Sequence, residues 1–252
     1  MGENSSKVQV AVSIVTHAHG QMVVNLVQQL LDCPEVEQLL LTCNVPEALT
    51  LPDAPRLITI HNASPKGFGA NHNAAFVRCR SPWFVVLNPD VVLQANPFQA
   101  LLAALNGSRA SVMAPAVINI AGIQEDSARH FPTLRQLTTK LLGGPNGRYI
   151  LQRTQGPTPV DWVAGMFMLF PAEDFKAIGG FDEKFFLYYE DVDICTRLWK
   201  AGRPVMVCPQ VQVVHDAQRA SRKNWQFMKW HAASMARYFW KHWGRLPRKS
   251  VS

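Results

Sequence analysis

Residues 179–197, GGFDEKFFLYYEDVDICTR, concentrate groups that can move a proton. Three carboxylates, Glu190, Asp191 and Asp193, follow an aromatic run and precede apolar residues at helical spacing. The macrodipole favours negative charge at the first turn of a helix, so these carboxylates can stay ionised even when aromatic side chains partly enclose them. The pattern predicts a general-base site. It also fits a surface helix with an acidic first turn, in which Asp193 pairs with Arg197 one turn on.

A second acidic group interrupts an apolar run. Residues 83–93 read WFVVLNPDVVL, so Asn88, Pro89 and Asp90 stand between two apolar segments. Pro89 cannot continue a central strand, which marks a break there. A buried carboxylate needs a cation or dense hydrogen bonding, because burying it bare is costly. Two interpretations stay open, a cation-binding carboxylate and an Asx-type turn between two strands.

Strands that alternate with helices would position these groups. We expect strands over residues 8–16, 39–42, 57–61, 83–87, 111–120, 160–170 and 204–215, and helices over 22–31 and 98–105. This order predicts an α/β fold with a mostly parallel sheet. Ligands of such sheets gather at the carboxyl ends of the strands, here residues 16–19, 43–44 and 62–69.

The loop over residues 62–75, NASPKGFGANHNAA, leads into a further helix. Gly67 and Gly69 permit a tight backbone, and the amides at the start of the helix can receive a phosphate or a polar base edge. The spacing differs from both the GxGxxG fingerprint and the P-loop, which argues against those two nucleotide sites.

The second half of the chain is less regular. Residues 124–149 lack periodicity and predict an irregular excursion or lid. Ala164 and Gly165 lie in the middle of the strand expected over 160–170, which suggests close approach of backbone or ligand. The last strand ends at His215, and such a histidine is more often satisfied by a hydrogen bond than by a metal unless a carboxylate lies nearby.

Composition limits the class of protein. The chain has 252 residues, 48% of them hydrophobic, which allows one large domain or two small ones. Its five cysteines form no CxxC pair, so we expect a reducing compartment without disulfides or a zinc site. No apolar run reaches 18 residues and MGENSSK lacks an apolar segment, so the sequence indicates neither a membrane span nor a signal peptide.

The positive charge is concentrated in the tail. Residues 1–216 carry 16 Lys and Arg against 18 Asp and Glu, whereas residues 217–252 carry 9 Lys and Arg and no acid. On a helical wheel the tail has an apolar face, made of Trp225, Met228, Ala232, Met235, Ala236, Phe239 and Trp243. The opposite face is basic, with Lys223, Arg237, Lys241 and Arg245.

Three interpretations of this tail differ in what it contacts: a membrane surface, the body of the protein or nucleic acid. Basic residues interleaved with aromatic ones suit an anionic membrane surface. Alternatively, the apolar face docks on the body and the basic face is solvated. Nucleic acid is disfavoured, since the body is net acidic and carries no recognised nucleic-acid module.

Together these segments resemble the bacterial glycosyltransferases of family 2, of the rhamnosyltransferase type. The resemblance runs from SIVTHAHG through KGFGANHNAA, LNPDVVL, VDWVAGMFML and the 179–203 segment to VVHDAQRAS. It implies a GT-A fold over residues 1–216, with a nucleotide-sugar half over about 8–120 and an acceptor half over 121–216, followed by the tail over 217–252.

The resemblance also implies roles for single residues. Asp191 matches the catalytic base, and Asp90 and His215 match the ligands of a Mg²⁺ or Mn²⁺ ion. The acceptor side is expected to be lined or oriented by Glu190, Asp193, Asp161, Trp162 and Gly165. The nucleotide sugar is expected at Thr16, His17, Asn44, Gly67, Phe68, Gly69, Asn73, Asn88 and Asp90. One departure is that no acid directly follows the second strand, where many members read the base.

The implied reaction is an inverting transfer of L-rhamnose from dTDP-β-L-rhamnose to a saccharide on a polyprenyl diphosphate. Such an enzyme would lie in the cytoplasm, peripherally on the inner membrane. Two rival classes were considered: a non-catalytic nucleotide-sugar-binding module, and a sugar-nucleotide pyrophosphorylase. The second lacks its glycine-rich loop after Thr16. Another donor sugar is the leading alternative within the transferase interpretation.

Overall fold

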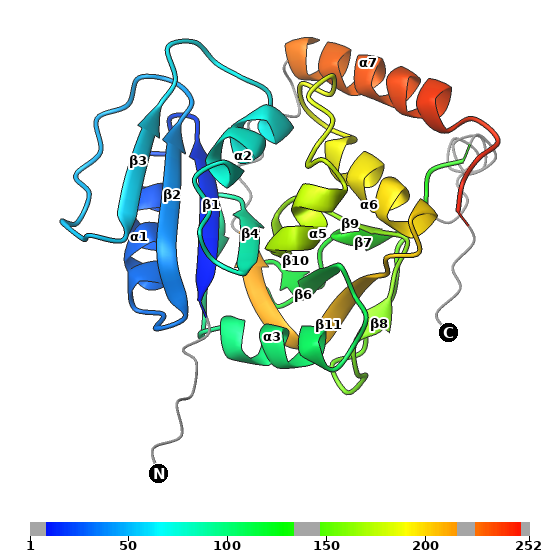
Figure 1. The fold of residues 1–252 in the computed structure, drawn as a ribbon, viewed down its shortest axis with the longest axis horizontal. Helices are drawn as coiled ribbons and strands as arrows, with labels where there is room; N and C mark the ends of the chain where they lie inside the picture. Colours follow the sequence, from blue (N-terminus) through cyan, green and yellow to red (C-terminus); the bar gives the residue numbers. More distant parts are fainter. Residues whose placement is uncertain (1–8, 134–146, 216–224, 248–252) are drawn as a thin grey trace.

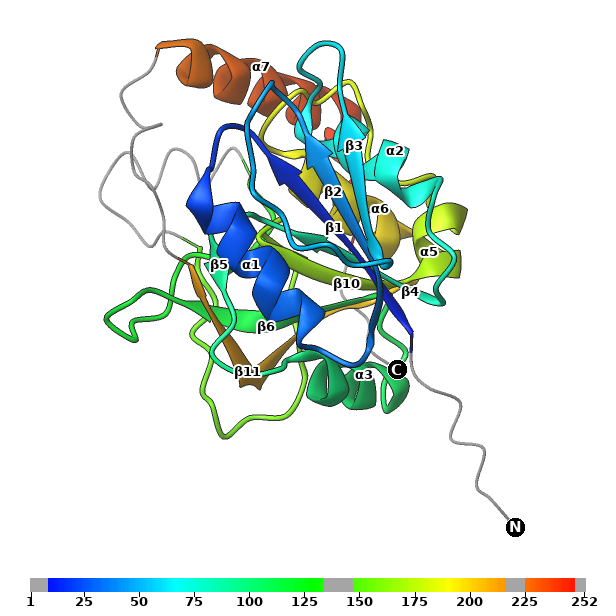
Figure 2. The same cartoon turned by 90° about the vertical axis from the view of Figure 1, so that its left-hand side faces the viewer.

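The computed structural model describes residues 9–133, 147–215 and 225–247. A central sheet is covered by helices on both faces (Figures 1 and 2). The helices α1 (Gln21–Leu31) and α3 (Phe98–Asn106) pack into one core cluster. On the opposite face, α2 (Phe68–Phe76), α5 (Ala172–Ala177) and α6 (Glu190–Lys200) join the second cluster. The three-layer α/β architecture expected from the sequence is confirmed.

The sheet is mixed but mostly parallel. Its strand order is β3-β2-β1-β4-β10-β6-β11-β5. Parallel pairs join β1 (Val10–Thr16), β2 (Val36–Cys43), β3 (Leu57–His61) and β4 (Trp83–Leu87), and also β6 (Val112–Ile118) and β11 (Val205–His215). The strand β10 (Phe167–Pro171) runs antiparallel to β4, and β5 (Val91–Val92) pairs antiparallel with the end of β11. Strands buried on both faces explain the continuous apolar runs.

The single strand expected over residues 160–170 is wrong. The chain turns at Gly165 and Met166, and this turn separates β9 (Trp162–Val163) from β10. The short β9 pairs with β7 (Ala128–Arg129) in a second sheet, while β8 (Thr158–Pro159) pairs with β11. The apolar run therefore serves two sheets, and the turn brings the Gly165 amide to the face that carries α6.

The loops that follow the first three strands meet at one edge of the sheet. The Asn44 amide donates to the Thr16 carbonyl (2.9 Å), and the Asn62 amide donates to the Cys43 carbonyl (3.1 Å). Asn44 Oδ1 also accepts hydrogen bonds from the Asn62 side chain (2.8 Å) and the Lys66 amide (2.8 Å). The expected convergence of residues 16–19, 43–44 and 62–69 is thus confirmed.

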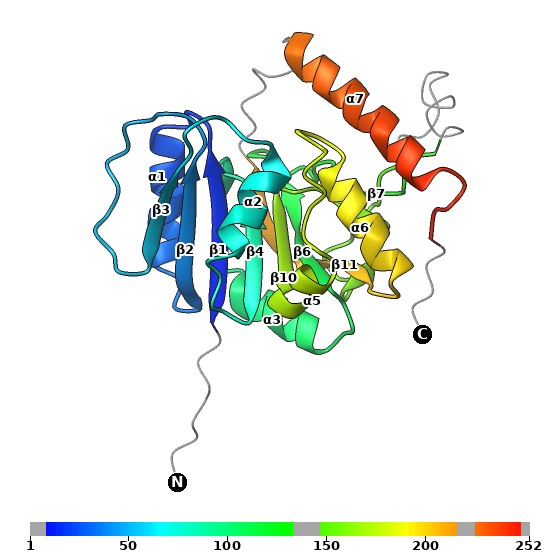
Figure 3. The same ribbon diagram turned by 45° about the horizontal axis from the view of Figure 1, so that its top comes forward.

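The C-terminal helix α7 (Trp225–His242) lies over the part of the molecule that carries α6 (Figure 3). Its docked face is formed by Ser234, Tyr238 and His242, which are buried. Trp225, Met228 and Trp243 are 66%, 56% and 66% exposed. The alternative in which the apolar face docks on the body holds in part, because Met235 and Phe239 of that face are partly buried and Phe239 packs against the core cluster that includes Tyr238.

Two further expectations about the tail are affected. Lys241, expected to be solvated, forms ion pairs with Asp182 (2.6 Å) and Asp193 (2.8 Å). Lys223 of the predicted basic face lies outside the described residues, as do residues 134–146 of the irregular excursion expected over 124–149. No helix in the described parts of the chain is long and apolar enough to span a bilayer.

Candidate active site

Asp191 is held at the start of α6 by backbone donors. Its Oδ2 accepts a hydrogen bond from the Gly165 amide (3.1 Å), and its Oδ1 accepts one from the Val192 amide (2.8 Å). Burial raises the pKa of Asp191 to about 6, although these backbone hydrogen bonds act in the opposite direction. A half-buried carboxylate with this pKa is ionised at neutral pH and can accept a proton.

The residues around Asp191 are strained and poorly solvated. Tyr188 and Tyr189 both adopt left-handed backbone conformations, with φ of 68° and 65°. Such conformations cost free energy and persist where the surrounding structure enforces them, often at functional sites. Glu190 is buried, and its Oε2 has no hydrogen-bond partner. Burial and the charge of Asp191 raise the pKa of Glu190, which favours a protonated Glu190 beside an ionised Asp191.

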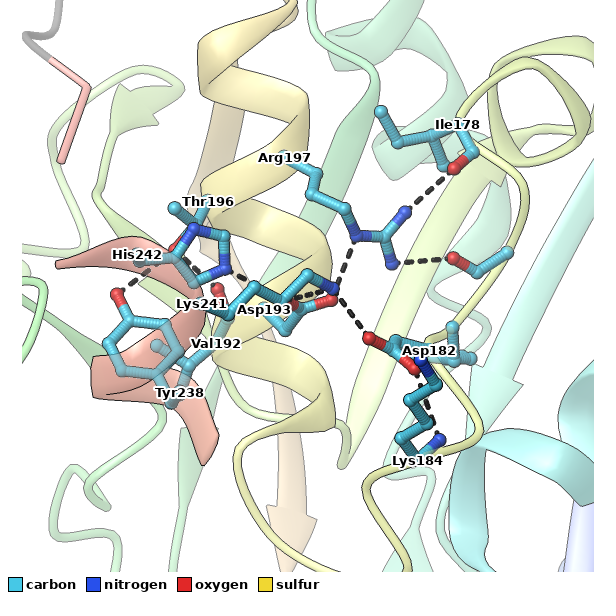
Figure 4. A network of polar contacts seen from close by, with 12 residues as sticks. Ile178, Asp182, Lys184, Val192, Asp193, Thr196, Arg197, Tyr238, Lys241 and His242 are labelled. Atoms are coloured by element: carbon cyan, nitrogen blue, oxygen red, sulfur yellow. Dashed lines mark hydrogen bonds and ion pairs between the residues drawn. The ribbon is translucent and has the colours of Figure 1, made fainter. Parts of the chain in front are cut away.

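Asp193 points to α7 instead of sharing the surroundings of Asp191. Its carboxylate is fully buried and contacts Arg197 Nε, Lys241 Nζ and His242 Nε2, each at 2.8 Å (Figure 4). The expected one-turn pair with Arg197 is confirmed. The expected orienting role is corrected, because three partners from α6 and α7 occupy this carboxylate.

The turn after β4 presents Asp90 to the last strand. Asp90 Oδ2 lies 3.0 Å from His215 Nε2, and His215 Nδ1 lies 2.7 Å from Glu125 Oε2. Burial lowers the pKa of His215, but the hydrogen bonds and charges of Asp90 and Glu125 outweigh it and raise the pKa to about 8. The Val91 amide donates to the Asn88 carbonyl (3.3 Å), so this segment is both a turn and the support of a carboxylate.

The resemblance implies a divalent cation, and Asp90 and His215 are the residues expected to bind it. Within the described residues no group of three or more His, Cys, Asp or Glu side chains could hold a metal ion. However, Asp90 Oδ1 is buried without a hydrogen-bond partner, and His215 Nε2 points at the same carboxylate. A carboxylate, an imidazole and diphosphate oxygens form a suitable ligand set for Mg²⁺ or Mn²⁺. The residues present fit a cation shared with a diphosphate.

Asp90 and Asp191 are connected through one turn. The Asn88 amide donates to the Met166 carbonyl (2.9 Å), and the neighbouring Gly165 amide donates to Asp191. The turn after β4 and the first turn of α6 are therefore both fixed to residues 165–166. This connection brings the two acidic groups, far apart in sequence, to the same side of the sheet.

The donor edge contains a carboxylate that the sequence reasoning missed. Glu47 accepts hydrogen bonds from Thr16 Oγ1 (2.7 Å) and from the Gly20 amide (2.5 Å). Glu47 lies three residues beyond Asn44. Asn44 occupies the position after the second strand at which many members of the resembled family carry an acid. The Asn44 side-chain amide is 3.3 Å from His17 Nδ1 and donates to the Lys66 carbonyl (3.0 Å). Thr16, His17 and Asn44 thus share one polar edge with Glu47.

The glycine-rich loop serves packing rather than forming an open cradle. A Cβ at Gly67 would lie 2.6 Å from the Phe186 carbonyl oxygen, and one at Gly69 would lie 2.6 Å from the Phe181 Cβ. The Phe68 amide, at the start of α2, already donates to the Phe186 carbonyl (2.9 Å). The tight backbone expected at these glycines is thus explained by close contact with the 181–186 segment.

Two more of the residues expected in the site, Asn73 and Gly165, make packing contacts. Asn73 pairs with the Phe181 backbone, donating to its carbonyl (2.9 Å) and accepting from its amide (2.9 Å). A Cβ at Gly165 would lie 2.9 Å from the Phe68 ring. Asn73, Gly165 and Phe68 therefore join the donor-side helix α2 to the segment that precedes Asp191.

Asp161 and Trp162 contact the described residues on either side of the 134–146 stretch. Asp161 accepts hydrogen bonds from the Phe131 amide (2.8 Å) and Tyr149 Oη (2.7 Å). The Trp162 indole donates to the His130 carbonyl (3.0 Å). These contacts fix the backbone of residues 130–131 and the Tyr149 side chain. Asp161 and Trp162 therefore act on the expected acceptor side through the backbone that they hold.

A family model described as "Glycosyltransferase like family 2" matches residues 10–236. The chain belongs to glycosyltransferase family 2. Among curated proteins it is 28% identical over 183 residues to the rhamnosyltransferase WbbL of Escherichia coli K12, covering 68% of this chain and 69% of that protein. It is 34% identical over 151 residues to the N-acetylglucosaminyl-diphospho-decaprenol L-rhamnosyltransferase of Mycobacterium tuberculosis, which covers 56% of this chain and 49% of that protein.

Solved glycosyltransferases share the fold of this family 2 chain. GalNAc-T7 with UDP, GalNAc and Mn²⁺ superposes with a TM-score of 0.68 at 13% identity, covering 88% of this chain and 45% of that one. The mannosyltransferase PcManGT of Pyrobaculum calidifontis, with GDP-Man and Mn²⁺, gives 0.60 at 13% identity, covering 92% and 63%. The predicted GT-A fold is confirmed.

Proposed function

We propose that this glycosyltransferase moves L-rhamnose from dTDP-β-L-rhamnose to a saccharide carried on a polyprenyl diphosphate, with inversion, during cell-surface polysaccharide synthesis. The observation that carries the proposal is that the turn at residues 165–166 bonds both to Asp191 and to Asn88, two residues before Asp90. The rhamnosyltransferase relatives support the sugar, and the mycobacterial relative supports the lipid-linked acceptor.

The reaction is a single in-line displacement. Asp191 Oδ accepts the proton of the acceptor hydroxyl as that oxygen attacks the anomeric carbon from the face opposite the nucleotide. Asp90 and His215 would hold a Mg²⁺ or Mn²⁺ ion, which would neutralise charge on the departing diphosphate. The hydrogen bond from Gly165 keeps the Asp191 carboxylate oriented towards the acceptor side.

The donor is tested with a panel of nucleotide sugars and Mg²⁺, measuring which nucleoside diphosphate is released. We expect dTDP release from dTDP-β-L-rhamnose to exceed the release of UDP or GDP from their sugars, because a donor site that is specific must recognise both the base and the sugar. Adding a polyprenyl-diphosphate-linked saccharide should increase this release. A higher rate with another sugar would replace the donor, and tight binding without release from any donor would favour a non-catalytic binding module.

The outward face of α7 supports a location at the cytoplasmic face of the inner membrane. The exposed side chains on this face include Trp225, Met228, Trp240 and Trp243, and Trp240 is 89% exposed. Lys229 Nζ lies 5.7 Å from the Trp225 ring centre, so a cation accompanies the aromatic side chains. Tryptophan at such positions suits the headgroup region of a bilayer, and the basic tail suits anionic lipids.

Replacing Trp225, Trp240 and Trp243 together by Ser is expected to release the protein from anionic vesicles in a sedimentation assay. Each indole contributes its apolar area to the bilayer, so the loss should reduce the bound fraction at least about tenfold. Activity on a water-soluble acceptor should stay near that of the unchanged protein, while activity on the lipid-linked acceptor should fall.

The matched control changes Met235, Phe239 and Leu246, which are partly buried, to Ala. We expect this control to lower stability and to leave vesicle binding of the folded fraction intact. Unchanged sedimentation of the triple Ser variant would make α7 purely structural. A truncation after Ser221 is a less specific test, because it would also remove Lys241 and His242 from Asp193.

A further inference from the structure

His215 is enclosed between two carboxylates from different parts of the chain. Asp90 Oδ2 lies 3.0 Å from its Nε2, and Glu125 Oε2 lies 2.7 Å from its Nδ1. The imidazole is 11% exposed and each carboxylate 19% exposed. The catalytic scheme above uses Asp90 and His215 and gives Glu125 no role.

The fold brings Glu125 to this place through a reversal after β6. The pairing of β6 with β11 sets Ile118 beside Val214, and β5 sets Val91 beside His215. Beyond β6 the chain turns back, so that Gln124 bridges to Ile118 and the Glu125 amide donates to the Val117 carbonyl (2.8 Å). Glu125 thereby reaches the side of His215 opposite Asp90.

We propose that Glu125 is the positioning residue of the cation site, fixing the His215 ring so that Nδ1–H faces the Glu125 carboxylate and Nε2 faces the cation. A carboxylate can only accept, so its 2.7 Å contact requires a proton on Nδ1. By the same rule the 3.0 Å contact of Nε2 with Asp90 places a proton on Nε2 when no cation is bound, and a cation would replace that proton while Nδ1 keeps the one held by Glu125. Carboxylate partners of this kind orient histidine ligands and increase their basicity. The inference rests on the cation dependence of the proposed function.

A purely structural role for the Glu125 carboxylate is poorly supported by the hairpin that carries it. The turn over residues 119–125 is closed by its own backbone, with the Asn119 amide donating to the Ile123 carbonyl (2.9 Å). Asn119 Oδ1 also accepts from the amides of Ala121 (2.9 Å) and Ile123 (3.0 Å). The hairpin is therefore closed without the Glu125 side chain, and the Glu125 carboxylate contacts His215 instead.

The test measures Mn²⁺ binding to the full chain by isothermal titration calorimetry with dTDP and no sugar. We work at pH 8.5, where most of the His215 imidazole is neutral. Glu125→Ala is expected to weaken Mn²⁺ binding by about 10- to 100-fold. Glu125→Gln keeps an acceptor without the charge and should give a smaller loss. Glu173→Ala, which removes an exposed carboxylate of α5, is the matched control and should bind Mn²⁺ as tightly as the unchanged protein.

A second readout separates ring orientation from folding. In ¹⁵N NMR spectra of the metal-free protein at pH 9, His215 should carry its proton on Nδ1, and Glu125→Ala should shift the ring towards a mixture of tautomers. Far-UV circular dichroism identifies a variant that fails to fold, in which case Glu125→Gln decides the question. Equal Mn²⁺ affinity or an unchanged tautomer in the folded variants overturns the proposal, as does a wild-type chain that binds no Mn²⁺. The titration is repeated with the nucleoside diphosphate that the donor panel releases, so a donor other than dTDP-rhamnose would overturn the proposed function and leave this result standing.

Discussion

Asp191→Asn is expected to reduce sugar transfer by about 10²- to 10⁴-fold, because the amide cannot accept the proton of the acceptor hydroxyl. The amide keeps one acceptor oxygen, so one of the two backbone hydrogen bonds, from Gly165 or from Val192, is retained. Nucleotide should still bind, since the donor edge is built from Thr16, Asn44 and their neighbours. Transfer is measured as release of nucleoside diphosphate with saturating acceptor, and nucleotide binding by calorimetry.

The pH dependence provides an independent signature of the same residue. Because the pKa of Asp191 is raised to about 6, the unchanged enzyme should lose activity as the pH falls below about 6 and the base becomes protonated. The residual activity of Asp191→Asn should lack this decline. Asp53→Asn, which changes an exposed acid on a remote loop, should match the unchanged enzyme at every pH. Undiminished turnover of Asp191→Asn would exclude the general-base role.

Local sequence patterns were sufficient to predict the main strands and helices of the fold. The strands β1 and β11 and the helix that begins with Glu190 agree closely with the expected segments, because their apolar residues follow clear patterns and their boundaries carry clear signals. The pairing of Asp193 with Arg197 was also accessible, since both lie one turn apart on the same helix. Residues close in sequence were thus placed well.

Contacts between distant segments were not accessible in the same way. Glu47 and Glu125 lie in loops without periodicity, and their roles depend on Thr16 and His215 from remote strands. The split of the 160–170 run follows from a second sheet formed with β7, which no local pattern announces. The docked side of α7 was only partly accessible, because the buried carboxylate of Asp193 binds His242 beside the core contacts of Tyr238 and Phe239. In each case a tertiary contact overrode the local pattern.

The contact between α6 and α7 predicts the largest effect on stability. Asp193→Asn is expected to lower the free energy of unfolding by about 3–5 kcal/mol at pH 7, the range seen when one member of a buried ionic network is removed. The variant leaves Arg197 and Lys241 without their shared buried counter-charge (Figure 4). His242 also loses an acceptor. Lys200 Nζ donates to His242 Nδ1 (2.7 Å), so Nε2 carries the proton given to Asp193.

The sign of the pH dependence distinguishes this ionic contribution from a loss of packing. Burial raises the pKa of Asp193, but the His242 hydrogen bond and the charges of Arg197 and Lys241 outweigh it and lower the pKa from 3.8 to about 2. A depressed carboxylate pKa stabilises the fold above the unfolded value of 3.8 and loses that contribution as the pH falls towards 2. The shift is worth roughly 2 kcal/mol. Urea unfolding of the two proteins should therefore converge by about that amount between pH 7 and pH 2.

Asp182→Asn is the matched control, because it removes the other carboxylate partner of Lys241 at a more exposed position. Its cost should be no more than about 1 kcal/mol, as for surface ion pairs. Equal losses for the two variants, or a gap that stays constant with pH, would mean that α7 is held by shape and apolar contact. The expected result would instead make the buried carboxylate of Asp193 the anchor that ties the proposed membrane-facing helix to the helix that carries Asp191.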